Sequence, residues 1–242
     1  MTDGGRRALL AGVALLLAGC AVRHGPGGEK ESHFEPRELA KGDIDRVVET
    51  HQQDILAGLQ RLAEKLYRRN PREWRRHELP SLDAAVSRIF SAPAEGWPEL
   101  EGRSEGEAIQ LAFREDYAGD RVAALMIGLR TMVDAAFENK REFFVLDDLN
   151  AQKLYNCARN VEIAVWKLST AQTAAGLPIL ISNELDPAHR NLSFEREFGR
   201  IIGNLDVLSR IVAGKNERTV NRVVQNIATA VFLPVKELGF IK

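Results

Sequence analysis

The chain has 242 residues, with 33 lysine and arginine side chains against 34 aspartate and glutamate side chains. A formal charge of −1 excludes a strongly basic nucleic-acid binder. Hydrophobic residues make up 45% of the chain and charged residues 28%, which excludes wholesale disorder and allows a buried core in one domain or in two small ones.

The first nineteen residues are expected to form a secretory signal peptide. Two arginines precede an apolar run over 8–17, which is shorter than the roughly 20 residues that a membrane-spanning helix needs. The run ends in Leu17-Ala18-Gly19-Cys20, which resembles the lipobox of bacterial lipoproteins. The resemblance implies cleavage before the cysteine and fatty acylation of that residue, for example with palmitate.

Lipidation of Cys20 predicts where the protein is held. Several acyl chains on one residue give near-permanent attachment to a bilayer. The resemblance further implies an outer-membrane lipoprotein on the periplasmic side, because Ala21 rather than aspartate follows the cysteine. Residues 20–42 are rich in glycine and carry mixed charge, so we expect a flexible tether. Cys157 is the only other cysteine, and an intramolecular disulfide is therefore not expected.

Residues 43–69 carry the clearest helical pattern in the chain. Their apolar positions recur at steps of three and four, which places them on one stripe of a helix. The stripe consists of Ile44, Val47, Val48, His51, Ile55, Leu59, Leu62 and Leu66. Asp43 is expected to cap the helix, and Pro71 to end it, because proline disfavours a helical residue before it. A helix of this length spans about 40 Å.

Shorter elements are expected in the middle of the chain. A helix is predicted over 81–91, and the proline- and glycine-rich segment 92–106 is predicted to be a loop. A short helix is predicted over 107–113, and the apolar run 177–181 is either a strand or a buried loop. Longer amphipathic patterns predict helices over 120–139, 148–175, 193–213 and 219–233.

The sequence therefore predicts an all-α protein, a bundle of amphipathic helices preceded by a signal peptide and a flexible tether. We expect four parts along the chain: a signal peptide (1–19), the lipidated Cys20 and tether (20–42), an N-terminal helical region (43–118) and a C-terminal four-helix core (119–242).

The densest cluster of charge lies at the end of the first long helix. It comprises Arg68, Arg69, Arg72, Trp74, Arg75 and Arg76. Arginine binds carboxylates and phosphates in a bidentate manner, and tryptophan favours wet interfaces. The cluster is a candidate contact surface for an envelope protein, for anionic lipid or for the cell wall. The alternative is a solvated helix end, where cations also suit the negative end of the helix dipole.

One motif with the letters of a catalytic site is present. Gly102-Arg103-Ser104-Glu105-Gly106 matches the G-x-S-x-G nucleophile elbow, which needs a buried strand before the serine. The preceding residues are acidic and contain a proline, so we interpret the match as chance in a polar loop.

No catalytic residue, metal site or cofactor is expected. The five histidines form no His-x-x-x-His pair. His51 is interpreted as lying at the edge of the core and His189 as a loop residue. Cys157 falls on the apolar face of its helix and is expected to be an inert, buried thiol.

Three stretches resemble those of an uncharacterised family of proteobacterial lipoproteins. They are KLYRRNP (65–71), QKLYNCARN (152–160) and NRVVQ (221–225). The resemblance implies a lipidated Cys20 and supplies no catalytic or binding residue to carry over.

These patterns together predict a membrane-anchored lipoprotein of the bacterial envelope, a non-enzymatic helical interaction or scaffold module that faces the periplasm. Two alternatives stay open: an envelope hydrolase whose active-site residues are scattered along the chain, and a carrier of an apolar ligand.

Overall fold

The structure is a computed structural model that describes residues 41–76, 79–91, 97–144, 147–183, 192–215, 220–222, 226–236 and 238. The expected signal peptide, Cys20 and residues 20–40 of the expected tether lie outside the described residues. The described part forms seven α-helices and one 3₁₀ helix, with no β-strand, so the prediction of an all-α helical bundle is confirmed. The elements are α2 (Asp43–Arg69), α3 (Pro71–Arg75), α4 (Leu82–Ser91), η3 (Pro98–Leu100), α5 (Glu105–Ala112), α6 (Arg121–Ala136), α7 (Ala151–Thr170) and α8 (Ser193–Lys215).

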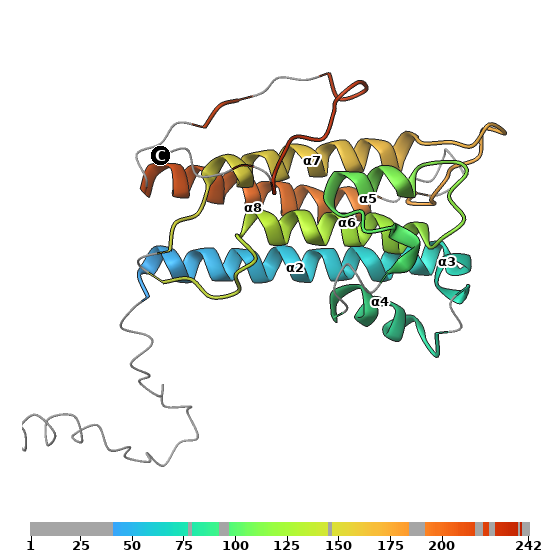
Figure 1. The fold of residues 1–242 in the computed structure, drawn as a ribbon, viewed down its shortest axis with the longest axis horizontal. Helices are drawn as coiled ribbons and strands as arrows, with labels where there is room; N and C mark the ends of the chain where they lie inside the picture. Colours follow the sequence, from blue (N-terminus) through green and yellow to red (C-terminus); the bar gives the residue numbers. More distant parts are fainter. Residues whose placement is uncertain are drawn as a thin grey trace, which may run out of the picture. The chain divides into compact units, whose positions relative to one another are not determined.

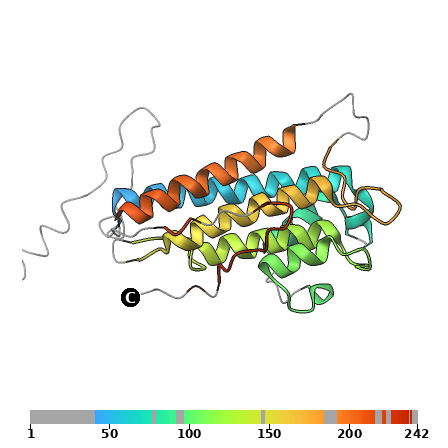
Figure 2. The ribbon, with the colours of Figure 1, turned by 90° about the horizontal axis from the view of Figure 1, so that it is seen from above.

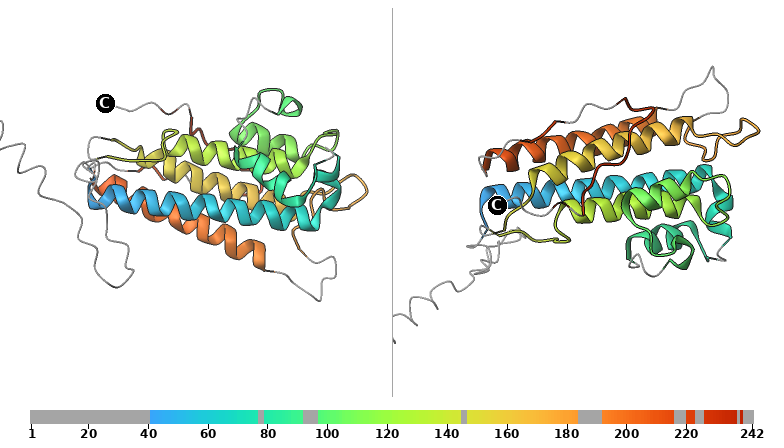
Figure 3. Two further views of the ribbon diagram at one scale, coloured as in Figure 1. Left: turned by 90° about the horizontal axis from the view of Figure 1, so that it is seen from below. Right: turned by 45° about the horizontal axis from the view of Figure 1, so that its top comes forward.

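Four long helices make the body of the bundle. Each of α2, α6, α7 and α8 packs against two of the others, so that they close a ring in the order α2, α6, α7, α8 (Figure 1). The shorter helices cover one side of this ring, where α5 packs on α6 and α4 lies against both α2 and α6. Figure 3 shows the same arrangement from two further directions, with α8 and α7 neighbouring along their length.

The apolar stripe of α2 explains how that helix joins the core. Ile55, Leu59, Leu62 and Leu66 are completely buried, as the periodicity predicts. Burial of a leucine or isoleucine side chain stabilises the fold by about 1.5–3 kcal/mol. Two residues of the predicted stripe, Ile44 and Val47, are instead exposed, whereas Val48 is buried. Gly42 rather than Asp43 is the N-cap, with its N–H donating to Asp45 Oδ2 over 2.8 Å.

Helix α6 is buried on almost every side, because α2, α4, α5 and α7 all pack against it. Gly128 allows the closest of these approaches. A β-carbon at this position would lie 2.6 Å from the carbonyl oxygen of Glu105, the first residue of α5. The absence of a side chain at Gly128 thus sets the distance between α5 and α6.

The composition of the predicted four-helix core was wrong. Residues 119–242 contain α6, α7 and α8, and the fourth core helix is α2 from the N-terminal region. Both predicted helical regions belong to one compact unit, Ala40–Lys242.

The helix predicted over 219–233 was also wrong, because the described residues 220–222 and 226–233 are not helical. Here side chains of α7 replace the hydrogen bonds that a helix would make. Asn160 Oδ1 accepts from the N–H of Leu233 over 2.6 Å, and Gln152 Oε1 accepts from the N–H of Asn221 over 2.8 Å. We call the described residues 220–222 and 226–236 the C-terminal segment. This segment, dark red in Figure 2, crosses α7 as an irregular chain.

The predicted helix over 148–175 is shorter than expected, because α7 ends at Thr170. The apolar run 177–181 is a loop, and only one isolated bridge, between Gln172 and Pro178, joins it to the preceding residues.

Candidate functional site

The arginine cluster lies at one end of the bundle. The chain enters α2 at Asp43, and Arg68 and Arg69 occupy the last turn of that helix, about 40 Å away at 1.5 Å per residue. Figure 1 shows α3 at the end of the bundle opposite to the start of α2. We call this surface, made of Arg68, Arg69, Arg72, Trp74, Arg75 and Arg76, the Arg-rich end.

Two polar side chains hold the backbone of the Arg-rich end in place. The amide of Asn70, the C-cap of α2, donates to the carbonyl of Ile181 over 3.0 Å and accepts from its N–H over 2.8 Å. The buried Glu73 of α3 accepts from the backbone N–H of Arg121 over 2.8 Å, at the first turn of α6. These contacts tie the corner between α2 and α3 to two distant parts of the chain, so the arginines stand on a rigid base.

Three arginines of the cluster are engaged within the protein. Arg68 pairs with Glu64 one turn earlier, with 2.6 Å between Nη2 and Oε1. Arg69 donates from Nη2 to the carbonyl of Asn183 over 2.6 Å. Arg76 donates to the carbonyl of Ala118, also over 2.6 Å. Their guanidinium groups therefore already have partners within the protein.

Arg72 and Arg75 differ from the other three, because both are exposed and form no ion pair with any residue that the structure describes. The guanidinium carbon of Arg75 lies 5.4 Å from the centre of the Trp74 ring, a cation–π arrangement. The Trp74 ring is half-buried against the core, and its Nε1 has no hydrogen-bond partner among the described atoms. The structure thus leaves the two exposed arginines available to an external acceptor, whereas Nε1 of Trp74 is buried.

The loop with the letters of a nucleophile elbow does not have the geometry of one. The 3₁₀ helix η3, rather than a strand, precedes Gly102, and Ser104 is the N-cap of α5. Ser104 nevertheless borders an open hollow of about 280 Å³ between α5 and α6. Its charged lining consists of Glu105, Arg130, Asp134 and Lys236. Glu105 has a φ of 48°, in the left-handed region that costs a non-glycine residue about 1 kcal/mol.

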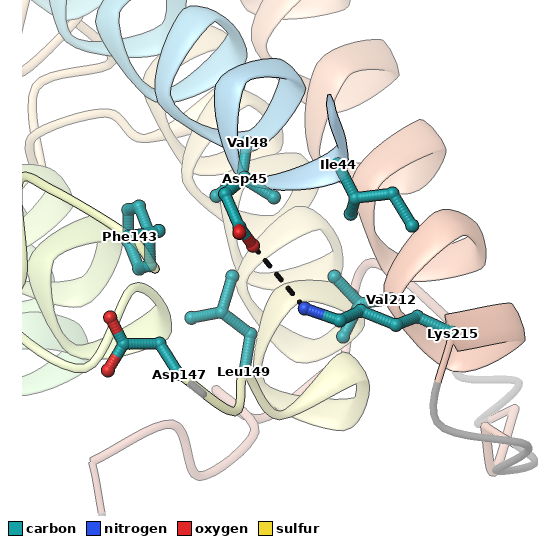
Figure 4. Close-up of a pocket in the computed structure, with 8 residues that line it drawn as sticks. All are labelled: Ile44, Asp45, Val48, Phe143, Asp147, Leu149, Val212 and Lys215. Carbon is teal, nitrogen blue, oxygen red and sulfur yellow. Dashed lines mark hydrogen bonds and ion pairs between the residues drawn. The ribbon is translucent and has the colours of Figure 1, made fainter. Parts of the chain in front are cut away.

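A second hollow lies where the chain enters the bundle (Figure 4). Val48, Phe143, Leu149 and Val212 line it, and its charged edge is the ion pair between Asp45 and Lys215, with 3.3 Å between Oδ1 and Nζ. Its free volume of about 10 Å³ has room for one water molecule at most, so it is a packing defect and not a ligand site.

The remaining candidate residues of the sequence have structural surroundings. Cys157 is fully buried, and burial raises the pKa of its thiol, with smaller contributions from Glu105 and Asp134. The prediction of a buried thiol is confirmed. His51 lies at the edge of the core, as expected, with Nδ1 3.2 Å from Oδ1 of Asn204. His189 lies outside the described residues. Among the residues that the structure describes, no group of three or more His, Cys, Asp or Glu side chains is placed to hold a metal ion.

The sequence patterns did not reveal two sets of polar residues that the structure brings forward. Arg121 donates to the carbonyls of Ala112, Arg114, Glu115 and Tyr117 and so ties together the loop between α5 and α6. On α7, three amides follow one another at four-residue steps and bind the C-terminal segment: Gln152, Asn156 and Asn160. The four-residue spacing of these amides was the signal in the sequence.

Comparisons with known proteins found no match for this chain. No protein-family model matches it, and searches of the curated proteins and of the solved structures gave no match. Within the described ranges, no helix combines the length and the hydrophobicity that crossing a membrane requires.

Proposed function

We propose that this protein is a lipid-anchored helical module of the bacterial envelope that contacts an anionic partner through its Arg-rich end. Two features support the proposal. The LAGC motif ending at Cys20 would attach the chain to a bilayer through acyl groups. The exposed Arg72 and Arg75 stand at the far end of α2 from the point where the chain enters the bundle.

The observation that carries the proposal is the difference among the five arginines. Internal partners account for Arg68, Arg69 and Arg76, but no described residue neutralises Arg72 or Arg75. A planar guanidinium suits carboxylate or phosphate groups, which accept two parallel hydrogen bonds. The envelope partner is accordingly expected to present carboxylates or phosphates, as do cell-wall polymers, acidic proteins and anionic lipid head groups.

The contact is tested by exchanging only the two exposed arginines. Arg72→Ser together with Arg75→Ser should weaken co-sedimentation with purified cell-wall sacculi at least fivefold while leaving the melting temperature unchanged. The matched control is Arg200→Ser with Arg210→Ser, which removes two exposed cations from α8. If both double variants lose binding equally, the effect comes from net charge and not from a specific contact. If the Arg72→Ser, Arg75→Ser variant binds as well as the unmodified chain, the proposed contact is wrong.

The anchor is tested separately. The native chain expressed in a Gram-negative host should partition into the detergent phase and carry an acylated N-terminus at Cys20. Cys20→Ser should move the protein into the aqueous phase without altering its helical content. If the unaltered chain keeps a free amino terminus and stays in the aqueous phase, the lipoprotein proposal fails while the contact at the Arg-rich end can still stand.

The hollow between α5 and α6 favours a second candidate function, that of an envelope hydrolase. Ser104, Glu105, Arg130 and Asp134 converge on it, as ionisable groups do in catalytic clefts. If it is an active site, Ser104→Ala and Arg130→Lys should each abolish turnover of an ester or amide substrate by the purified chain. Retained turnover in both variants would exclude this hollow.

A further inference from the structure

Three amides on one face of α7 form a regular row. Gln152, Asn156 and Asn160 are spaced four residues apart, so that they lie one above another on the helix. Asn156 and Asn160 are buried, at 4% and 1% exposure, which is uncommon for this residue type. Gln152 Nε2 donates to Asn156 Oδ1 over 2.9 Å and fixes the orientation of both side chains. We call Gln152, Asn156 and Asn160 the amide row.

Every member of the amide row forms hydrogen bonds with the main chain of the C-terminal segment. Asn160 accepts from the N–H of Leu233 over 2.6 Å and donates to its carbonyl over 2.8 Å. Asn156 donates to the carbonyl of Pro234 over 2.8 Å. Gln152 makes the same two-way pair with Asn221, with bonds of 2.8 and 3.0 Å. All the bonds that the amide row makes to the C-terminal segment go to backbone groups, so these bonds recognise an extended chain whatever its side chains are.

Side-chain selectivity comes from two places beside the row. Phe232 packs against Gly106 so closely that a β-carbon on the glycine would lie 2.8 Å from Cβ of Phe232. Three residues later, Val235 is almost fully buried, at 1% exposure. The site therefore favours a segment with a large apolar side chain followed, three positions on, by a small branched one.

The C-terminal segment fits this site against its own local preference. Val220, Val223, Val224, Ile227 and Val231 recur at helical steps in the sequence, whereas the described residues of this stretch are not helical. Ile227 and Val231 are exposed, at 40% and 69%. A segment whose propensity conflicts with its structure is less firmly held than one in which the two agree.

We propose that the amide row and Gly106 form a binding site for an extended peptide segment of a partner protein, and that the chain's own C-terminal segment occupies this site until the partner displaces it. If the C-terminal segments of two copies of the chain changed places, the contacts formed would equal the contacts broken. Nothing would then offset the translational freedom that association costs. A partner segment can add contacts of its own. This inference is independent of the anchor and of the Arg-rich end.

The first test measures binding of a labelled peptide with the sequence of residues 229–238. In the unmodified chain the tethered segment competes at millimolar effective concentration, so the peptide should bind weakly. Phe232→Ala with Val235→Ala weakens the tethered segment and should increase peptide affinity at least tenfold. Adding Asn156→Ala and Asn160→Ala should reverse the gain, whereas adding Gln60→Ala, an exposed amide on α2, should not. A peptide with serine at the Phe232 and Val235 positions should not bind.

The second test needs no variant and applies even if these substitutions unfold the chain. In hydrogen exchange under native conditions, the N–H of Leu233 should exchange at least tenfold faster than that of Val161, which is fully buried on α7. Equal protection of the two amides would make the segment a permanent part of the core and would overturn the proposal. Absence of peptide binding to the Phe232→Ala, Val235→Ala chain would also overturn it. If the unmodified chain forms a concentration-dependent dimer and the peptide dissociates it, the site serves self-association, and the proposal of a partner protein is overturned.

Discussion

The hydroxyl of Tyr67 donates a hydrogen bond of 2.8 Å to Oδ2 of Asp120, and both residues are fully buried. The other carboxylate oxygen of Asp120 accepts from the N–H of Ala123 over 2.8 Å and caps the first turn of α6. One side chain thus links the last turn of α2 to the first turn of α6, which are far apart in the sequence. This link lies directly beneath the Arg-rich end.

Tyr67 should make the stability of the bundle sensitive to alkaline pH. Burial, and next the neighbouring charge of Asp120, raise the pKa of its hydroxyl far above the ordinary value of about 10. In the folded chain Tyr67 stays protonated, whereas in the unfolded chain it ionises near pH 10. Its contribution to stability is therefore complete below pH 10 and is lost progressively as the pH rises above that value.

Tyr67→Phe separates this contribution from the hydrogen bond. The variant should lose about 1–3 kcal/mol at pH 7, because a buried oxygen of Asp120 loses its donor. Between pH 10 and 11.5 its free energy of unfolding should fall less steeply than that of the unmodified chain, by up to about 1.4 kcal/mol per pH unit. Urea unfolding measured across this range tests both values. Parallel curves for the two chains would contradict the assignment to Tyr67.

Gly128 in the middle of α6 and Gly203 in the middle of α8 should respond in opposite ways to the same substitution. Gly128→Ala places a β-carbon 2.6 Å from the carbonyl oxygen of Glu105, and we expect a loss of about 1–3 kcal/mol as α5 moves away. Gly203 lies on the exposed side of α8 with no atom within 4 Å of an added β-carbon. Gly203→Ala should stabilise the chain by up to about 1 kcal/mol, since alanine has the higher helix propensity. Thermal unfolding of both variants measures the contrast, and a similar shift in both would mean that the α5–α6 contact is loose.

The long helices could be predicted from the sequence, because each carries its own apolar stripe. For α2 the predicted range 43–69 agrees with the structure at both ends. The C-terminal segment has an equally regular stripe, but its conformation depends on hydrogen bonds from Gln152 and Asn160, which are about 70 residues distant along the chain. Periodicity reports only on neighbours in the sequence, so it could not detect this competition.

The Arg-rich end could be recognised in the sequence for the same reason, since its members lie within nine residues, from Arg68 to Arg76. Which arginines remain available was not visible. Arg69 is engaged by a carbonyl 114 residues away and Arg76 by one 42 residues away. Arg121 was missed entirely, because a single arginine at a helix start carries no pattern, although its guanidinium gathers four carbonyl groups.

Arg121 should be far more sensitive to a conservative exchange than an exposed arginine. Its guanidinium donates to carbonyls in several directions at once, and burial lowers its pKa. Arg121→Lys keeps the charge but cannot make all of these bonds. We expect a loss of about 1–3 kcal/mol and faster tryptic cleavage after Arg114, in the loop that Arg121 holds. Arg103→Lys, at an exposed pair with Glu101, should change the stability by less than about 0.5 kcal/mol. If both variants behave alike, the four carbonyl contacts contribute little.

The thiol of Cys157 should react only after the bundle opens. It is fully buried, and desolvation raises the pKa of the thiol, so almost no thiolate exists in the folded chain at neutral pH. In a chain that carries Cys20→Ser, the labelling rate with a disulfide reagent should be independent of reagent concentration at high concentration and should equal the unfolding rate. The same chain in concentrated urea should react completely within the mixing time. Labelling of the native protein faster than its measured unfolding rate would reveal a local opening around Cys157, and it would place this residue in a mobile part of the core rather than at its centre.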